Sequence, residues 1–306
     1  MKTSNVFCKE ILILIFIFNF HHSFCQDLVL NLDSSKDMIN NSVKSSPDND
    51  LSIKGRNVFR LNPGVDWTIT LAGSAWSIYT MTKIYNKGAS TLDQINSLSK
   101  DDINKFDRYL AIYPWDSALD KESYYPFYAA FPLPFIFFLT GSDMRNDFWQ
   151  LSFLYWETMA ATGITGFSAT YFENKYRPYA YDPGTRMDIR TGQGAKNSFY
   201  AGHVEVVAAS SFFIAQVYAS YYPESNAKWV FYGGASAFTL GMGYMRLASG
   251  NHFPSDILLG MGVGSLTGML VPYFHNHHII KNTDLSLTPF SNSNGRGLSL
   301  VYNFNK

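Results

Sequence analysis

The sequence predicts an all-α protein, a helical bundle of about five to six apolar helices followed by a short C-terminal β-hairpin. Two observations predict the bundle: apolar runs of helix length recur along the chain, and only 16% of residues are charged, against about 25% in ordinary soluble domains. A third, a change to alternating apolar and polar residues near the C-terminus, predicts the hairpin. The apolar runs lie at about residues 67–82, 124–142, 148–172, 201–222, 229–245 and 257–274.

Residues 1–25 have the pattern of a signal peptide. Lys2 and Lys9 precede an uncharged apolar run from Ile11 to Phe20, whose length suits a signal-peptide core and is short for a membrane span. We therefore expect export, with cleavage before Gln26. Residues 26–64 are rich in Ser, Asn, Asp and Lys and have too little apolar surface to fold alone, so a polar arm or linker is expected there.

The last two apolar runs, 229–245 and 257–274, are free of charge over lengths close to the ~18 to 20 residues that span a bilayer. Both are rich in small residues, which let helices approach closely in a membrane. The mean hydropathy of -0.08 is low for a protein with many spans, so a large soluble helical core stays an alternative. If all six runs span after cleavage of the signal peptide, the connections 173–200 and 246–255 face the cytoplasm. They face outward if one run, such as a surface helix at 67–82, does not span, or if the first run is retained differently.

Residues 276–306 make up a tail with a different period. Leu298, Leu300 and Tyr302 alternate with polar residues after an Asn-Gly-Arg-Gly turn, which is typical of a β-hairpin. Two strands cannot close a membrane barrel, so we expect a small appended hairpin.

The charge and cysteine content excludes several classes of protein. The chain has 24 Lys and Arg against 24 Asp and Glu, without a basic stripe, so no nucleic-acid partner is expected. Cys8 and Cys25 lie in or beside the first apolar stretch and leave no disulfide or thiolate metal site for the rest of the chain. His275, His277 and His278 have no carboxylate or cysteine close by in sequence, so we expect an exposed loop there, no metal and no cofactor.

Three polar patches stand at the ends of apolar runs: NKYRPYAY at 174–181, NSFYAGHVE at 197–205 and MRLASGNHFPSD at 245–256. The first two share one connection and the third occupies the next but one, so in an up-and-down bundle all three fall at the same end. Together they bring two arginines, two histidines and a carboxylate. Such a set favours binding of a tetrahedral oxyanion, because guanidinium groups offer forked N–H donors.

These patches resemble the three-part signature of the type 2 phosphatidic acid phosphatase (PAP2) superfamily, which also holds bacterial acid phosphatases and vanadium haloperoxidases. The resemblance covers residues 148–275, under half of the chain, and the third motif is its most specific part. It implies a PAP2-like helical domain over residues 65–275 and phosphoryl transfer without a metal.

The resemblance also implies a role for each site residue. His252 would attack phosphorus to give a phosphohistidine, and Asp256 would hold the His252 ring in the tautomer that leaves the attacking nitrogen unprotonated. His203 would protonate the leaving alkoxide and then activate water. The residues expected to bind phosphate are Arg177, Arg246 and the backbone of Gly202.

The chain departs from the family pattern at two phosphate-binding positions. Thr170 stands where a lysine is expected, and Ala201 stands where a serine usually precedes Gly-His. Losing such a donor can cost on the order of 10²-fold in rate. Lys175 or Lys196 could take over the role of the missing lysine, since a flexible ammonium need not come from one backbone position.

We therefore expect an exported or membrane-embedded phosphatase that hydrolyses a phosphate monoester or diphosphate of a lipid through a phosphohistidine. Its expected place is the inner membrane with the site facing the periplasm, or the periplasm itself. Two alternatives stay open: a soluble periplasmic non-specific acid phosphatase, and a catalytically weakened or inactive relative that binds phosphorylated lipid. Thr170 and Ala201 motivate the second. The pattern does not choose among lipid substrates and carries no prediction of oligomeric state.

Overall fold

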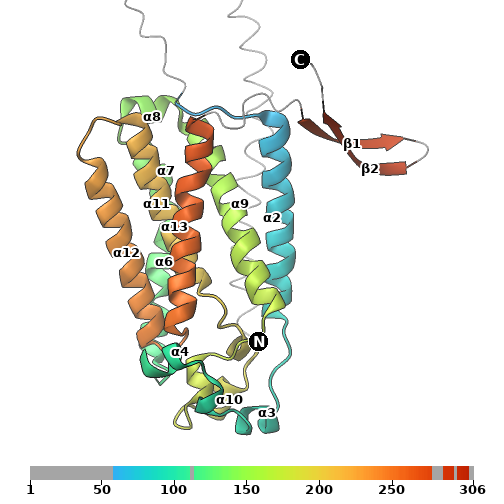
Figure 1. The fold of residues 1–306 in the computed structure, drawn as a ribbon, viewed down its shortest axis with the longest axis vertical. Helices are drawn as coiled ribbons and strands as arrows, with labels where there is room; N and C mark the ends of the chain where they lie inside the picture. Colours follow the sequence, from blue (N-terminus) through green and yellow to red (C-terminus); the bar gives the residue numbers. More distant parts are fainter. Residues whose placement is uncertain (1–57, 111–113, 278–284, 293–294, 303–306) are drawn as a thin grey trace, which may run out of the picture. The chain divides into compact units, whose positions relative to one another are not determined.

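The computed structural model describes residues 58–110, 114–277, 285–292 and 295–302 (Figure 1). Between residues 58 and 277 the described chain is helical and has no strand, which confirms the predicted all-α class. The predicted signal peptide and most of the predicted polar arm lie outside the described residues.

Five long helices make up most of the described part, and they coincide with five of the six predicted apolar runs. Pro63 and Pro254 lie in the first turn of two of them, where a missing N–H leaves no hydrogen bond unmade. The side chain of Asn62 caps the first by accepting the N–H of Val65. The long helices are α2 (Pro63–Tyr85), α9 (Phe148–Phe172), α11 (Gly202–Tyr221), α12 (Lys228–Ala248) and α13 (Pro254–Asn276).

Two of the predicted runs differ from the structure. The run at 124–142 does not form one helix but two short ones, α6 (Tyr124–Ala130) and α7 (Leu133–Phe138), because Pro132 and Pro134 have no N–H to continue the hydrogen-bond ladder. The run at 67–82 is longer than predicted. As α2 it has 23 residues and packs along α9.

Short helical segments fill the connections that follow α2 and α9. Side chains of Thr91, Ser99 and Asp116 cap three of them at their N-termini. The short segments are α3 (Leu92–Asn96), η1 (Lys100–Asp102), α4 (Lys105–Leu110), α5 (Ser117–Glu122), α8 (Ser142–Asn146), η2 (Pro178–Tyr181), α10 (Met187–Arg190) and η3 (Gln193–Lys196).

The long helices alternate in direction, so their connections gather at two ends of the bundle. At one end lie α3, α4 and α10, and at the other lies α8 (Figure 1). Arg246, in the last turn of α12, bonds Asp120 of α5 at the first end, whereas Tyr221, at the end of α11, donates to Asp147 before α9 at the second. The first end, called the site end below, therefore receives the connections from α9 to α11 and from α12 to α13, as the sequence predicts.

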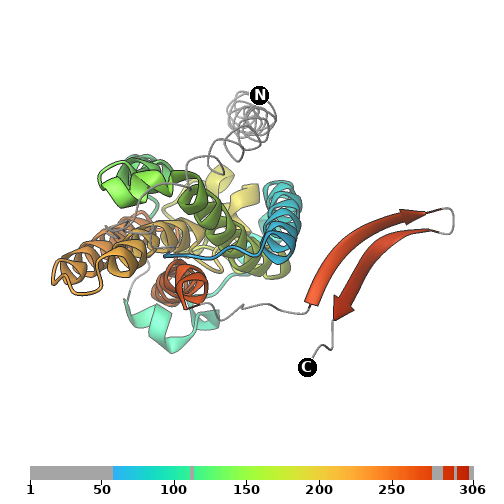
Figure 2. The ribbon, with the colours of Figure 1, turned by 90° about the horizontal axis from the view of Figure 1, so that it is seen from above.

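Close contact between α11 and α13 depends on glycine. A Cβ added at Gly260 would lie 2.7 Å from the carbonyl oxygen of Ala201, and one at Gly264 would lie 2.3 Å from that of Glu205. Side chains at these positions would force the helices apart. Seen end on, α13 in red lies beside the other long helices (Figure 2). The small-residue pattern thus fixes the start of α11 against the start of α13, where two of the polar patches lie.

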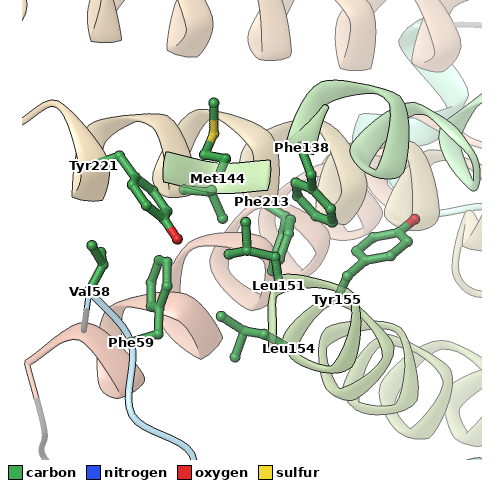
Figure 3. Close-up of a cluster of buried hydrophobic side chains, with 10 residues drawn as sticks. Val58, Phe59, Phe138, Met144, Leu151, Leu154, Tyr155, Phe213 and Tyr221 are labelled. Carbon is green, nitrogen blue, oxygen red and sulfur yellow. The ribbon is translucent and has the colours of Figure 1, made fainter. Parts of the chain in front are cut away.

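The other end of the bundle holds a hydrophobic core that contains no site residue. Aromatic and aliphatic side chains from α7, α8, α9 and α11 meet there (Figure 3). Each fully buried side chain of this size contributes roughly 1.5 to 3 kcal/mol relative to exposure. The buried members are Val58, Phe59, Phe138, Met144, Leu151, Leu154, Tyr155, Phe213, Val217 and Tyr221.

Much apolar surface stays exposed on the outside of the bundle. Two described helices, α11 and α13, are long and apolar enough to cross a membrane. Most of α11 is buried inside the bundle, but only 28% of the apolar stretch of α13 is. Large side chains on α2, α12 and α13 are also more than one third exposed, among them Ile78, Val230 and Leu266. This surface bears on the proposed location below.

Two strands follow the bundle. β1 (Leu285–Asn292) pairs antiparallel with β2 (Gly295–Tyr302), with Leu285 opposite Tyr302. Their side chains lie outside the described residues, and the role of the tail stays a prediction.

Candidate active site

The structure brings residues of all three polar patches together at the site end. Arg177 directly precedes η2, Arg246 lies in the last turn of α12, and His252 lies in the loop between α12 and α13. Burial holds the pKa of His252 well below its ordinary value, and the positive charges of Arg177 and Arg246 lower it further, with a smaller effect from His203. All four side chains are therefore close enough to act on one another electrostatically.

His252 is buried, with 2% of its surface exposed, and its ring is oriented by the backbone. Its Nδ1 lies 2.7 Å from the carbonyl oxygen of Ser198. Because a carbonyl oxygen only accepts, Nδ1 carries the hydrogen and donates it. Nε2 then holds a lone pair, and it is buried without a hydrogen-bond partner. A neutral imidazole with a free, inward-facing lone pair is the form a nucleophile needs.

The two arginines are each fixed through one end of the guanidinium group. Nη1 of Arg246 donates to Asp120 at 2.8 Å and to the Ser123 hydroxyl at 2.7 Å, and Nη1 of Arg177 donates to the side-chain oxygen of Asn251. Nε of both arginines is buried and has no partner. A buried N–H without an acceptor is costly, so we expect a bound group to accept hydrogen bonds from these two N–H groups.

The N-terminus of α11 adds backbone donors on the same side. The helix begins at Gly202 without a side-chain cap, so its first N–H groups have no side-chain acceptor. A Cβ at Gly202 would meet no atom within 4 Å, which shows open space in front of it. The ring of His203, half-buried, packs against Tyr124 and Phe127 with centroid distances of 4.9 and 4.5 Å. A helix N-terminus of this kind favours an anion.

Taken together, these groups make a candidate oxyanion site. Two guanidinium N–H donors, an uncapped helix N-terminus and one imidazole lone pair are available, and the positive charges outnumber the carboxylates bonded to them. A tetrahedral phosphoryl group has oxygens that can accept from such donors.

The comparison with protein-family models matches residues 151–280 to the PAP2 superfamily. Residues 151–280 are called the PAP2 region below, and their match is consistent with membership of the superfamily. Members of the superfamily are generally phosphatases. The PAP2 region contains every site residue predicted from the sequence, whereas α2 to α8 lie before it. No curated protein and no solved structure matches the chain.

Within the PAP2 region, Asp256 differs from its predicted contact. Its carboxylate does not bond His252 but accepts from Lys175 Nζ at 2.8 Å, from the Ser198 hydroxyl at 2.7 Å and from the N–H of Phe253 at 3.2 Å. The reason is local. As the third residue of α13, Asp256 turns back to cap its own helix through Oδ2, which also accepts from the Ser198 hydroxyl, and Oδ1 accepts from Lys175. Asp256 reaches His252 only through Ser198.

The two lysines proposed as replacements for the missing family lysine are placed differently. Lys175 lies between two carboxylates, Asp256 at 2.8 Å and Asp107 at 3.2 Å, so its charge is neutralised inside the protein. Lys196 is half-buried and acts electrostatically on Lys87. Lys87 itself donates to the carbonyl oxygen of Thr170 at 2.6 Å. The ammonium group beside position 170 therefore comes from the segment after α2, before the PAP2 region.

Four further residues organise the site and were not found from the sequence. Ser198 and Asn251 lie inside the motifs, next to predicted residues, and that position is a signal that could have pointed to them. Asp107 and Asp120 lie in α4 and α5, where nothing in the local sequence distinguishes them from surface acids. Only the folded chain brings these two carboxylates to Ser255 and Arg246.

Proposed function

We propose that the protein is a phosphatase that hydrolyses a phosphate monoester or diphosphate of a lipid through a phosphohistidine. One observation carries the proposal. Nε of Arg177, Nε of Arg246 and Nε2 of His252 are all buried without partners, in side chains that influence one another electrostatically. A phosphoryl group offers oxygens that accept from the two N–H groups and a phosphorus atom that the Nε2 lone pair can attack.

His252 acts as the nucleophile in this proposal. Its Nε2 forms a bond to phosphorus while the bond between phosphorus and the leaving-group oxygen breaks. The ring becomes positively charged on attack, and the Ser198 carbonyl, which holds the Nδ1 hydrogen at 2.7 Å, stabilises that charge. Because the pKa of His252 is lowered, the ring stays neutral and able to attack below the pH at which a free histidine would be protonated.

Arg177, Arg246 and the N-terminus of α11 bind the non-bridging oxygens of the phosphoryl group. These donors are in place before the reaction, because Asn251 and Asp120 already fix the arginines. Preorganised donors are effective when charge builds up on those oxygens.

His203 acts as the general acid and base. Burial and the charges of Arg246 and Arg177 hold the pKa of His203 well below its ordinary value, and a bound phosphoryl anion raises it again. His203 then donates a proton to the leaving oxygen in the first step and takes one from water in the second. That water attacks phosphorus, the bond to Nε2 of His252 breaks, and inorganic phosphate leaves. His203 lies at the start of α11 and packs against the rings of Tyr124 and Phe127. A leaving group that accepts the proton of His203 would therefore lie close to these aromatic side chains.

A lipid substrate fits the placement of the site. The exposed apolar side chains of α2, α12 and α13 suit a hydrocarbon environment, and the site lies at one end of the bundle. With the bundle in a membrane, that end would lie at the level of the lipid headgroups. The inner membrane, with the site facing the periplasm, is the location we propose.

The test is release of phosphate by detergent-purified protein. We expect phosphatidic acid or a polyprenyl diphosphate to be hydrolysed in the presence of a chelator, and His252→Ala to abolish the reaction. His277→Ala, which removes an exposed histidine after α13, should leave the rate unchanged.

Release that persists in His252→Ala would contradict the mechanism. The absence of release by folded wild-type protein from both lipids and from p-nitrophenyl phosphate would contradict the function. Measurable binding of phosphatidic acid in that case would favour the catalytically inactive lipid-binding relative, which Thr170 and Ala201 motivate.

A further inference from the structure

A second group of buried polar side chains lies far from the phosphate site. Asp66 of α2, Glu157 of α9 and His275 of α13 have 0%, 7% and 4% of their surface exposed, and their ligand atoms all lie within 4.8 Å of one another. The 23 residues of α13 span roughly 34 Å, with Asp256 in the first turn and His275 in the last. His275, predicted in an exposed loop, is therefore a buried helix residue beside two carboxylates, and that expectation was wrong.

The three side chains face one another through two carboxylates and one imidazole nitrogen, and one carboxylate oxygen, Asp66 Oδ2, also accepts the N–H of Asn62 at 2.6 Å. Nδ1 of His275 lies 2.8 Å from the Val271 carbonyl oxygen, so Nδ1 carries the hydrogen and Nε2 holds a lone pair. Nε2 lies 3.4 Å from Asp66 Oδ2 and 3.4 Å from Glu157 Oε2. His275 Nε2 and Glu157 Oε2 have no hydrogen-bond partner, and neither has Asp66 Oδ1. A cation between them would remove the repulsion.

The distances favour a metal ion over a second proton on His275. An imidazolium N–H bonded to a carboxylate normally gives a nitrogen-to-oxygen distance of about 2.7 to 2.9 Å, shorter than either distance here. Ligands held tetrahedrally at about 2.1 Å from zinc lie about 3.4 Å from one another. A histidine whose other nitrogen donates to a backbone carbonyl is also the usual form of a metal ligand.

The charges agree with this assignment. When both buried carboxylates are ionised and the imidazole is neutral, the cluster carries two negative charges, which a divalent cation cancels. The hydroxyl of Thr70 is buried without a partner, one helical turn after Asp66 on the same face of α2. It offers an oxygen for the remaining position or for a water bound there.

We propose that Asp66, Glu157 and His275 bind a divalent transition-metal ion, with zinc the best fit to two oxygens and one nitrogen. The ion would tie α2, which precedes the PAP2 region, to α9 and α13 within it. Its role would be structural, because the catalytic residues lie at the other end of α13.

The experiment measures metal binding directly in full-length protein with Cys8→Ser and Cys25→Ser, so that no thiolate contributes. The protein is stripped with EDTA, dialysed and titrated with Co²⁺, whose tetrahedral complexes absorb visible light. We expect one Co²⁺ per chain with these bands, and displacement of the bands by Zn²⁺. Zn²⁺ alone should raise the thermal unfolding midpoint of the stripped protein by several degrees, since it binds the folded state.

Two histidine variants serve as matched controls. His275→Gln should lose the bands and weaken Co²⁺ binding at least 100-fold, whereas His277→Gln, two residues further on, and His252→Gln, in the phosphate site, should keep both. Absence of the bands and of the thermal shift in stripped protein with intact His275 would overturn the proposal without relying on any variant. Unchanged binding in His275→Gln would overturn it as well. Neither result depends on phosphatase activity.

Discussion

Ser198 connects the carboxylate and the imidazole that the sequence alone would have placed in direct contact. Its hydroxyl donates to Asp256 at 2.7 Å, and its carbonyl oxygen accepts from Nδ1 of His252 at 2.7 Å. Asp256 thus fixes the peptide segment that orients the nucleophile. In this arrangement Asp256 is a positioning residue, and its effect on the reaction passes through one serine.

This connection predicts strong coupling between the two residues. Asp256→Asn should lower kcat by about 10- to 100-fold, by analogy with metal-binding histidines, where loss of the hydrogen bonds that orient the ring has effects of this size. Ser198→Ala, which keeps the carbonyl but loses the hydroxyl, should lower it less. The double variant should be no slower than Asp256→Asn alone, because both changes remove the same contact.

The measurement is kcat for p-nitrophenyl phosphate in the four proteins of the cycle. Asp188→Asn, at an exposed ion pair with Arg186, is the matched acid-to-amide control and should retain full activity. Losses that simply multiply in the double variant would show that Asp256 acts on His252 by another route.

At the scale of elements, the contact between α11 and α13 sets the geometry of the site. His203 begins one helix and Asp256 begins the other, and the N–H of Ala201 donates to the carbonyl oxygen of Asp256 at 3.2 Å. The glycines of α13 permit this closeness along the whole length of the two helices. A change in the middle of the contact should therefore affect the stability of the bundle as well as the site.

Gly264→Ala tests this contact. The added Cβ would lie 2.3 Å from the Glu205 carbonyl oxygen, so we expect a loss of about 1 to 3 kcal/mol from overpacking. Gly262→Ala, two residues earlier in α13, meets no atom within 4 Å and should be neutral or stabilising, since alanine favours a helix. Thermal unfolding in detergent compares the two. Equal midpoints would show that the helices can separate without cost.

The features of the fold that could be predicted are those that depend on the local distribution of apolar and polar residues. Apolar runs bounded by polar residues predicted five long helices, and the order of the connections predicted that the motifs meet at one end. Residues 124–142 do not form the single apolar helix that their composition predicts, because two prolines interrupt it. Contacts between distant segments, such as Asp120 with Arg246 or Asp66 with His275, leave no periodic signal in the sequence.

At the scale of the whole described bundle, six elements run from end to end: α2, the pair α6 and α7, α9, α11, α12 and α13. Residue 58 therefore lies at the end opposite the phosphate site. If the bundle spans a membrane, a site facing the periplasm places residue 58 on the cytoplasmic side. A cleaved signal peptide would leave it on the periplasmic side. With all six elements crossing the membrane, the proposed orientation therefore agrees with retention of residues 1–25 and not with the cleavage before Gln26 that the sequence predicts.

Labelling with a membrane-impermeant maleimide tests the orientation in the Cys8→Ser and Cys25→Ser background. Gln193→Cys, exposed at the site end, should react in intact spheroplasts, and Glu224→Cys, exposed at the other end, should react only after permeabilisation. The reverse pattern would place the site in the cytoplasm. Labelling of both positions would favour a soluble periplasmic protein.

The arginines of the site also determine how the reaction ends. Among the ion pairs of the described residues, Arg246 has Asp120, while Arg177 is held only by the neutral amide of Asn251. The positive charge of Arg177 is thus not balanced by a carboxylate among the described residues before substrate binds. Inorganic phosphate, the product of the proposed reaction, meets the same excess charge as the ester did. Release of inorganic phosphate would then limit the turnover rate, and a high phosphate concentration would inhibit the enzyme by binding at the active site.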